Sequence, residues 1–184
     1  MSLRIEPSAD IHLSAVFKAA PYMALLPYED EDDNPEVALG SLTAEDPIVV
    51  MLELVVDPQE KAEKLRVLQL HLDTEDVHLQ QEVHVPVSLS PKEGDIPSRL
   101  FNFLERISVF RLQEKAWIAL EAGDAKQATS YLQAAATRLF DLGYGELAES
   151  AMLEVGRMAR GRTPTGRGRK KLRYGTRSLS IPST

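Results

Sequence analysis

The chain has 184 residues, of which 43% are hydrophobic and 27% charged, and it contains no cysteine. This composition is ordinary for a globular protein, and it excludes disulfides, thiolate metal sites and a cysteine nucleophile. No apolar run approaches the ~20 residues that a membrane-spanning helix needs, and the first residues lack the apolar stretch of a signal peptide. We therefore expect a cytoplasmic protein with one large domain or two small ones.

Positive charge is concentrated near the C-terminal end of the chain. No Asp or Glu follows Glu154, whereas nine Lys and Arg residues do. Residues 1–154 hold the other 12 basic residues and all 28 acidic residues, which gives 12 − 28 = −16. Such asymmetry is typical of a tail that binds a partner or contacts the acidic part of its own chain.

Residues 1–91 are predicted to form an antiparallel β-sandwich. Short apolar or alternating segments separated by turn residues, at roughly ten-residue spacing and with no helix between them, favour a sandwich over a parallel α/β sheet. The predicted strands are 3–6, 10–17, 22–26, 36–42, 47–56, 64–74 and 77–89.

Three of these strands carry more specific predictions. In 10–17 the two-residue period places Ile11 and Phe17 on one face and Val16 on the other. The almost continuous apolar run 47–56 predicts a central strand. Pro86 lacks a backbone N–H, so it predicts an edge position or a bulge for the strand 77–89.

Residues 95–160 are predicted to form three helices. Apolar side chains at three- and four-residue spacing indicate amphipathic helices at 98–122, from about 124 to 142, and from about 146 to 159. Gly123 is expected to end the first helix in the left-handed conformation, and Gly143 is expected to end the second helix. Asp124 is expected to cap the second helix, with Gln127 as its reciprocal capping partner.

Two groups of potential metal ligands are better explained as ordinary surface features. The acidic run 29–33 offers carboxylates to calcium, but it lacks the alternating spacing and the glycine of an EF-hand loop, so a solvated loop is favoured. His71 and His84 are candidate cross-strand neighbours, and zinc would need convergent ligands from further strands. We predict no metal, no cofactor and no catalytic residue.

The basic tail 161–184 is predicted to be either flexible or docked. Residues 172–182 have a strand-like pattern, and their arginines can contact acidic loops of the chain. Nucleic acid is the alternative ligand, but a single aromatic residue lies among the cations, and the acidic body repels polyanions. The predicted interaction residues are Lys170, Lys171, Arg173, Tyr174 and Arg177, with Trp117 as a packing anchor.

The helical region and the tail carry a family resemblance. The stretch 106–158, RISVFRLQEKAWIALEAGDAKQATSYLQAAATRLFDLGYGELAESAMLEVGRM, and GRKKLRYGTRSL at 168–179 resemble the C-terminal part of bacterial von Willebrand factor type A (VWA) proteins. The proteins they resemble are those of the chloride-channel-like, inter-alpha-inhibitor-like group of VWA proteins. In these proteins a VWA domain is followed by a β-sandwich, a short helical bundle and a basic tail. The segment LGSLTAEDPIVVMLELVV, leading into LRVLQLHLD, is similar in character to that sandwich.

The resemblance implies an accessory role outside the VWA domain itself. The DxSxS signature of the VWA metal site is absent from this sequence, so no metal-binding residue carries over. We predict an α+β chain with a β-sandwich at 1–91, a helical bundle at 95–160 and a basic tail at 161–184. The implied function is non-enzymatic: it supports a VWA domain of the same polypeptide and mediates protein–protein interaction. The alternative is a nucleic-acid-associated protein that binds through the tail.

Overall fold

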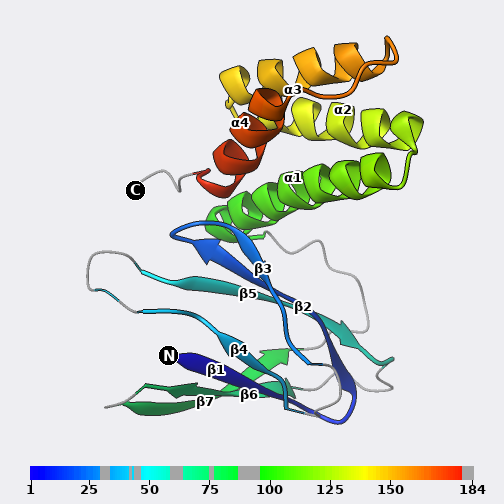
Figure 1. Ribbon diagram of the computed structural model, residues 1–184. Coiled ribbons are helices and arrows are strands. Elements are labelled where there is room, and N and C mark those ends of the chain that lie inside the picture. Colours follow the sequence, from blue (N-terminus) through cyan, green and yellow to red (C-terminus); the bar gives the residue numbers. More distant parts are fainter. Residues whose placement is uncertain are drawn as a thin grey trace. The chain divides into compact units, whose positions relative to one another are not determined.

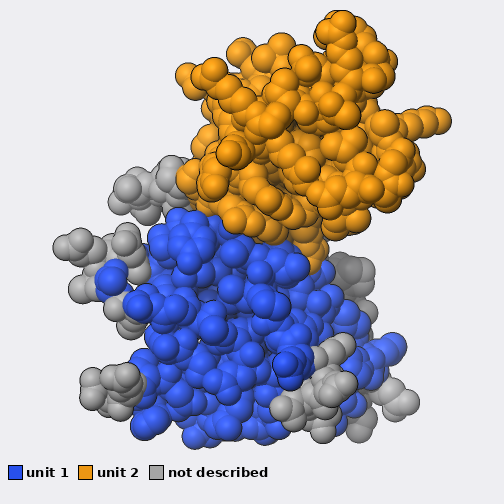
Figure 2. Space-filling model, in the orientation of Figure 1, with its two compact units in different colours: residues 1–95 blue, residues 96–184 orange. Residues whose placement is uncertain are grey.

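Figure 1 shows the computed structural model, which describes residues 1–29, 34–41, 43, 47–58, 64–74, 77–86 and 96–179. The chain divides into two compact units, Met1–Asp95 and Ile96–Thr184 (Figure 2). Within the described ranges, every strand belongs to the first unit and every helix to the second. The predicted α+β class, with antiparallel sheets followed by helices, is confirmed.

The described strands of the first unit form two antiparallel sheets. One has the order β4-β1-β6-β7, from β1 (Ser2–Pro7), β4 (Glu36–Ala38), β6 (Lys64–Asp73) and β7 (His78–Pro86). The other has the order β3-β2-β5, from β2 (Ile11–Ala20), β3 (Ala24–Leu26) and β5 (Val49–Val56). Both sheets contribute to one buried apolar cluster, so they pack as a sandwich. Its members are Leu3, Ile5, Ile11, Val16, Val37, Leu39, Val67 and Leu68.

The position of β7 in its sheet agrees with the prediction from the sequence, and that of β5 does not. β7 lies at the edge of its sheet, as Pro86 predicted. The predicted central position of the 47–56 segment is wrong, because among the described strands β5 pairs with β2 alone. A continuous apolar run indicates that a strand is shielded from water, but it does not determine how many strands lie beside it.

A β-bulge decides which side chains of β2 face the core. The pairing of β2 with β5 shifts between Leu13 and Ala15. One inserted residue moves every later side chain to the opposite face of the strand. Val16, and not Phe17, therefore joins Ile11 in the sandwich core, and the predicted face is wrong beyond the bulge.

The second unit contains four helices within residues 96–179. α1 (Ser98–Glu121), α2 (Ala125–Asp141) and α3 (Gly145–Met158) match the three predicted helices to within about two residues at each end. α4 (Gly166–Arg177) lies in the predicted basic tail. All four helices surround one core cluster, which includes Trp117 of α1, Leu132 of α2, Val155 of α3 and Leu172 of α4.

Glycine turns end the helices as predicted, with one correction at the second cap. Gly123 has φ of +82°, the left-handed conformation predicted there, and Gly143, which was predicted only to end its helix, has the same φ. The Asp124 side chain accepts a hydrogen bond from the Gln127 backbone N–H at 2.9 Å, which confirms the cap. The predicted reciprocal hydrogen bond, between the Gln127 side chain and the Asp124 backbone N–H, is wrong. The Asp124 N–H instead donates to the Ala119 carbonyl, and the Gln127 side chain donates to the Tyr131 hydroxyl.

Candidate interaction site on the C-terminal helix

The basic segment folds as a helix because its first turn is capped and one face is buried. Thr165 occupies the N-cap position of α4, and its hydroxyl accepts a hydrogen bond from the Gly168 backbone N–H at 2.9 Å. Leu172 and Thr176 are one helical turn apart, and both are buried. The strand-like interpretation of 172–182 is therefore wrong for residues 172–177, while residues 180–182 lie outside the described chain.

A buried carboxylate joins α3 to the start of α4. Glu154 of α3 is only 5% exposed and accepts two hydrogen bonds from Thr165: one from the backbone N–H at 2.8 Å and one from the hydroxyl at 2.6 Å. The Nε atom of Arg157 lies 3.7 Å from the same carboxylate. We did not predict this contact from the sequence. The available signal was a threonine at an N-cap position, placed 11 residues after the last acidic residue of the chain.

Two glycines allow α4 to approach α3 closely. A Cβ atom at Gly168 would overlap the Glu154 carboxylate. A Cβ atom at Gly175 would lie 2.6 Å from Cδ1 of Leu147. At Gly166, in contrast, no atom lies within 4 Å of the position that a Cβ would take. The glycines at 168 and 175 are therefore explained by helix packing, in the middle of an otherwise cationic segment.

Two arginines of α4 contact acidic residues of α1. Arg169 forms an ion pair with Glu121, and its guanidinium lies 5.2 Å from the centre of the Trp117 ring. The Nε atom of Arg173 lies 4.0 Å from Oε1 of Glu114. Arg173, one of the arginines predicted to contact acidic loops, thus lies near a glutamate of a helix, while residues 30–33 of the acidic loop lie outside the described residues. Ion pairs this exposed contribute about 1 kcal/mol or less, whereas a cation over an aromatic ring adds roughly 0.5–1 kcal/mol.

The face of α4 opposite to the buried Leu172 and Thr176 carries exposed cations. Arg167, Lys170, Lys171 and Tyr174 recur at three- and four-residue spacing, so they share one face of the helix, and all four are exposed. Tyr174 is 67% exposed. None of the three cations forms an ion pair or hydrogen bond with a described residue. We call these four residues the cationic stripe.

The remaining predicted interaction residues occupy less exposed places. Trp117 is 2% exposed and belongs to the helical core cluster. Arg177 is half-buried near the end of α4. Arg173, although exposed, faces Glu114. The predicted set is thus divided: Lys170, Lys171 and Tyr174 lie on the stripe, while Trp117 lies in the core and Arg173 near Glu114. Arg177 belongs to neither group and is half-buried.

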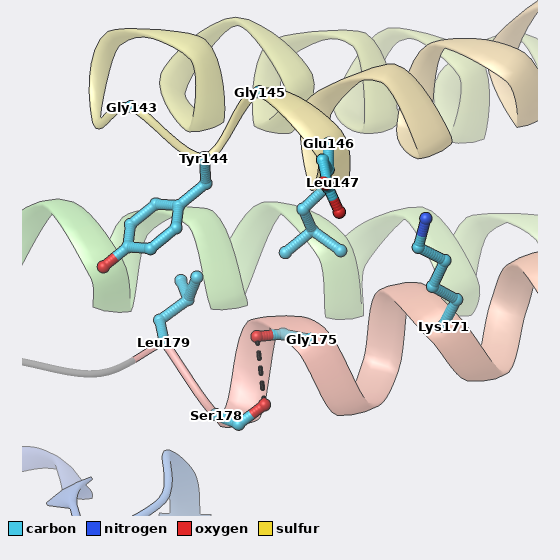
Figure 3. Close-up of a pocket in the computed structure, with 9 residues that line it drawn as sticks. All are labelled: Gly143, Tyr144, Gly145, Glu146, Leu147, Lys171, Gly175, Ser178 and Leu179. Atoms are coloured by element: carbon cyan, nitrogen blue, oxygen red, sulfur yellow. Dashed lines mark hydrogen bonds between the residues drawn. The ribbon is translucent and has the colours of Figure 1, made fainter.

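A groove of about 400 Å³ lies beside the stripe, between the start of α3 and the second half of α4. Figure 3 shows Leu147 pointing towards α4, and the Lys171 side chain extending from α4 towards the start of α3. Lys171 therefore belongs to both the stripe and the groove. The lining residues are Gly143, Tyr144, Gly145, Glu146, Leu147, Lys171, Gly175, Ser178 and Leu179.

The other candidate sites of the sequence do not form a metal centre in the described chain. Of the acidic run 29–33, residues 30–33 lie outside the described residues. His71 pairs with Gln80 and His84 with Arg66, so the predicted cross-strand contact between the two histidines is wrong. Within the described ranges, no group of three or more His, Asp or Glu residues is placed to hold a metal ion.

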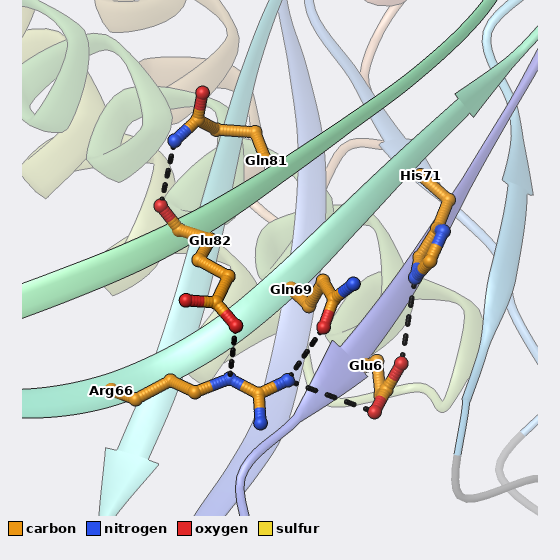
Figure 4. Close-up of polar contacts among 6 residues, drawn as sticks. All are labelled: Glu6, Arg66, Gln69, His71, Gln81 and Glu82. Carbon is orange, nitrogen blue, oxygen red and sulfur yellow. Dashed lines mark hydrogen bonds and ion pairs between the residues drawn. The ribbon is translucent and has the colours of Figure 1, made fainter.

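A polar network covers the outer face of the four-stranded sheet (Figure 4). Arg66 donates to Oε1 of Gln69 at 2.7 Å and lies 3.7 Å from Glu6 and 3.6 Å from Glu82. Nε2 of His71 lies 3.4 Å from Oε2 of Glu6. A bulge between Arg66 and Leu68 brings Arg66 to the same face as Gln69, although they are an odd number of residues apart. These charges neutralise one another across three strands.

One carboxyl of this sheet has a shifted pKa. The hydrogen bond between Nδ1 of His78 and Oδ1 of Asp73, at 2.7 Å, is the main reason that the pKa of Asp73 lies below its ordinary value of 3.8. The charges of His78, Arg4 and His71 lower this pKa further, while partial desolvation opposes them. The pair is exposed, so we interpret it as a surface contact near the end of β6.

Comparisons with known proteins match the helical unit and the fold of the whole chain. A family model described as "Sll0103-like, C-terminal alpha-helical domain" matches residues 98–182. A solved structure titled "von Willebrand factor type A from Catenulispora acidiphila" has a similar fold, with a TM-score of 0.65 and 14% sequence identity. No curated protein matches the chain.

These matches define the scope of the likeness. The fold similarity covers 99% of this chain but 46% of the Catenulispora chain, so the present chain spans less than half of that protein. The family match begins at the first residue of α1 and includes α4, so the basic helix lies within the matched helical domain. The resemblance to VWA proteins is thus supported at the level of fold. No helix in the described part of the chain combines the length and apolarity needed to span a membrane.

Proposed function

We propose that this chain is a non-enzymatic accessory module that supports a VWA domain and binds other proteins. One observation carries the proposal: a structure named for VWA shares the fold of nearly the whole chain, yet more than half of that structure lies outside the match. A module that accompanies a VWA domain has this relation to a longer VWA protein. The match of the helical unit to a C-terminal domain family is consistent with the same arrangement.

The described polar groups support a structural role for the module. The buried Glu154 is engaged by two donors of Thr165. The charged side chains on the outer sheet face pair with one another, and Arg169 pairs with Glu121. These contacts stabilise the two units, and they require no substrate to satisfy the groups involved.

The test begins with the complete reading frame and continues with binding. We expect the frame to encode a domain with a DxSxS signature. That domain, produced as a separate polypeptide, is expected to form a one-to-one complex with the chain in calorimetry and light scattering. A ligand at 100 times its Kd also raises the free energy of unfolding by about 2.7 kcal/mol, which denaturant unfolding detects. An unrelated acidic domain, similar in size to the DxSxS-bearing domain, is the control for non-specific binding.

Two results would contradict the proposal. One is a reading frame without a DxSxS-bearing domain. The other is a separately produced VWA domain that is folded and binds metal, but neither forms a complex with the chain nor stabilises it.

A further inference from the structure

We propose that the cationic stripe and the adjoining groove form one binding site for an acidic peptide segment of a partner protein, with one apolar side chain of that segment in the groove. This inference rests on the proposed function, because it assigns a partner chemistry to the protein-binding role. The residues that carry it are Arg167, Lys170, Lys171 and Tyr174 on the stripe, and Leu147 and Leu179 in the groove.

The first argument is charge. Arg169 and Arg173 lie near the glutamates of α1, so the arginines on that side of α4 are balanced within the unit. Arg167, Lys170 and Lys171 have no such partner among the described residues. Carboxylates of a partner can therefore form charge-assisted hydrogen bonds with them without displacing an existing acid.

The second argument is the shape and lining of the groove. Its volume of about 400 Å³ falls within the range of roughly 300–1,000 Å³ that binding pockets occupy. Leu147 and Leu179 contribute apolar surface, and both belong to the helical core cluster, so the packing of the unit fixes their positions. Lys171 lies at the junction of the groove and the stripe (Figure 3). A peptide with one apolar side chain flanked by carboxylates can therefore place the apolar side chain in the groove and the carboxylates on the stripe.

The third argument is rigidity. The start of α4 is held by the hydrogen bonds between Glu154 and Thr165, and its second half by the burial of Leu172 and the close approach of Gly175 to Leu147. The stripe and the groove thus have fixed positions before any partner arrives. Preorganisation of this kind reduces the entropy cost of binding.

A peptide fits these features better than a nucleic acid does. One aromatic residue, Tyr174, lies on the stripe, whereas single-stranded nucleic acids are bound by several stacking aromatics along a basic channel. Leu147 and Leu179 in the groove offer no polar contact to a phosphodiester, but they can pack against an apolar side chain of a peptide.

The test is an NMR titration of the isotope-labelled chain. The probe is a short synthetic peptide in which glutamates flank one central leucine. We expect saturable shifts of the amides in 143–147 and 166–179. The double variant Lys170→Glu/Lys171→Glu should weaken binding at least ~10-fold, because it converts two attractions into repulsions. Lys126→Glu, at an exposed position on α2, is the matched control and should bind like the parent chain.

Peptide variants separate the two parts of the site. Replacing the central leucine by serine should remove the shifts of residues 143–147, and replacing the glutamates by glutamines should remove those along the stripe. Unchanged amide shifts elsewhere establish that the double variant is folded. Lys170→Gln/Lys171→Gln, which removes charge without adding acid, is expected to give an intermediate loss.

Several outcomes would overturn the inference. The absence of shifts at these amides with millimolar peptide is one. Equal binding by the double variant and the parent is another. Shifts of the stripe with a single-stranded oligonucleotide or with anionic vesicles, but not with the peptide, would assign the surface to a different ligand. Because the titration uses the chain alone, these results leave the measured complex with a VWA domain unaffected, so failure here is distinguishable from failure of the proposed function.

Discussion

At the scale of single residues, Glu154 is the buried side chain that joins α3 to the start of α4. It is the last acidic residue of the sequence, it is buried, and both of its oxygens accept hydrogen bonds from Thr165. Hydrogen bonds to a charged group contribute about 1.5–3 kcal/mol, and a buried donor that loses its acceptor costs about 1–3 kcal/mol. This carboxylate therefore stabilises the start of the basic helix.

Glu154→Ala tests this role directly. We expect a loss of about 2–4 kcal/mol in the free energy of unfolding, because the Thr165 N–H and hydroxyl lose their acceptors. Denaturant unfolding followed by the fluorescence of Trp117, which lies beneath Arg169 of α4, measures it. Glu149→Ala, at an exposed position on the same helix, is the control and should change stability by about 0.5 kcal/mol or less. Equal stabilities of the two variants would contradict the assigned role.

Asp73 and His78 provide a prediction about pH. The hydrogen bond from His78 lowers the pKa of Asp73 in the folded state, so its contribution to stability is present above the unfolded pKa and disappears as the pH falls through the lower folded pKa. His78→Gln should raise the pKa of Asp73 towards 3.8, as measured by NMR titration of the carboxyl carbon. His84→Gln, on the same strand, should leave that pKa unchanged. An Asp73 pKa that is the same in both variants would refute the assigned cause.

At the scale of elements, the close approach of α4 to α3 depends on a glycine. Gly168→Ala should lower the free energy of unfolding by about 1–3 kcal/mol, because the new methyl group overlaps the Glu154 carboxylate and displaces it from its hydrogen bonds with Thr165. Gly166→Ala should be neutral or stabilising by up to ~1 kcal/mol, since its Cβ meets open space and alanine favours the helix. Thermal unfolding monitored by circular dichroism compares the two variants, and the reverse order of stability would be incompatible with this packing.

The elements that sequence reasoning identified correctly are those with local signals. Helix ends depend on glycines and a capping aspartate within a few residues, and the ends at Gly123 and Gly143 agree with the prediction. Side-chain faces in the strands were predicted wrongly beyond a bulge, because the extra residue of β2 is visible only in its pairing with β5. α4 was missed because the residues that fix it, Glu154 and Leu147, lie on another helix.

The candidate site was predictable in composition and not in geometry. The sequence predicts that the interacting residues lie among the cations around Tyr174, and this stays a prediction. It could not separate Arg173, which faces Glu114, from Lys171, which lines the groove, because that division depends on which side of α4 meets α1. The groove itself combines the α2–α3 turn with α4, two segments about 30 residues apart, and no local pattern encodes their contact.

At the scale of the whole molecule, the two units differ in charge sign. Residues 96–184 contain 15 basic and 8 acidic residues, a balance of 15 − 8 = +7, whereas the whole chain has −7. The first unit therefore carries −7 − 7 = −14. The proposed acidic peptide is therefore expected to be attracted to the helical unit and repelled by the sandwich.

The two units also have separate cores, and this separation gives a prediction for unfolding. The sandwich cluster and the helical cluster share no residue. Ile5→Ala removes a fully buried side chain from the sandwich, and Leu139→Ala removes one from the helical core. Each should lower the free energy of unfolding by about 2–5 kcal/mol, but in a different unit.

Hydrogen exchange of strand amides reports on the sandwich, and the fluorescence of Trp117, the single tryptophan, reports on the helices. Ile5→Ala should mainly increase the exchange of the strand amides. Leu139→Ala should mainly lower the unfolding midpoint measured by Trp117 fluorescence. Equal responses of both probes to both substitutions would instead indicate one cooperative folding unit.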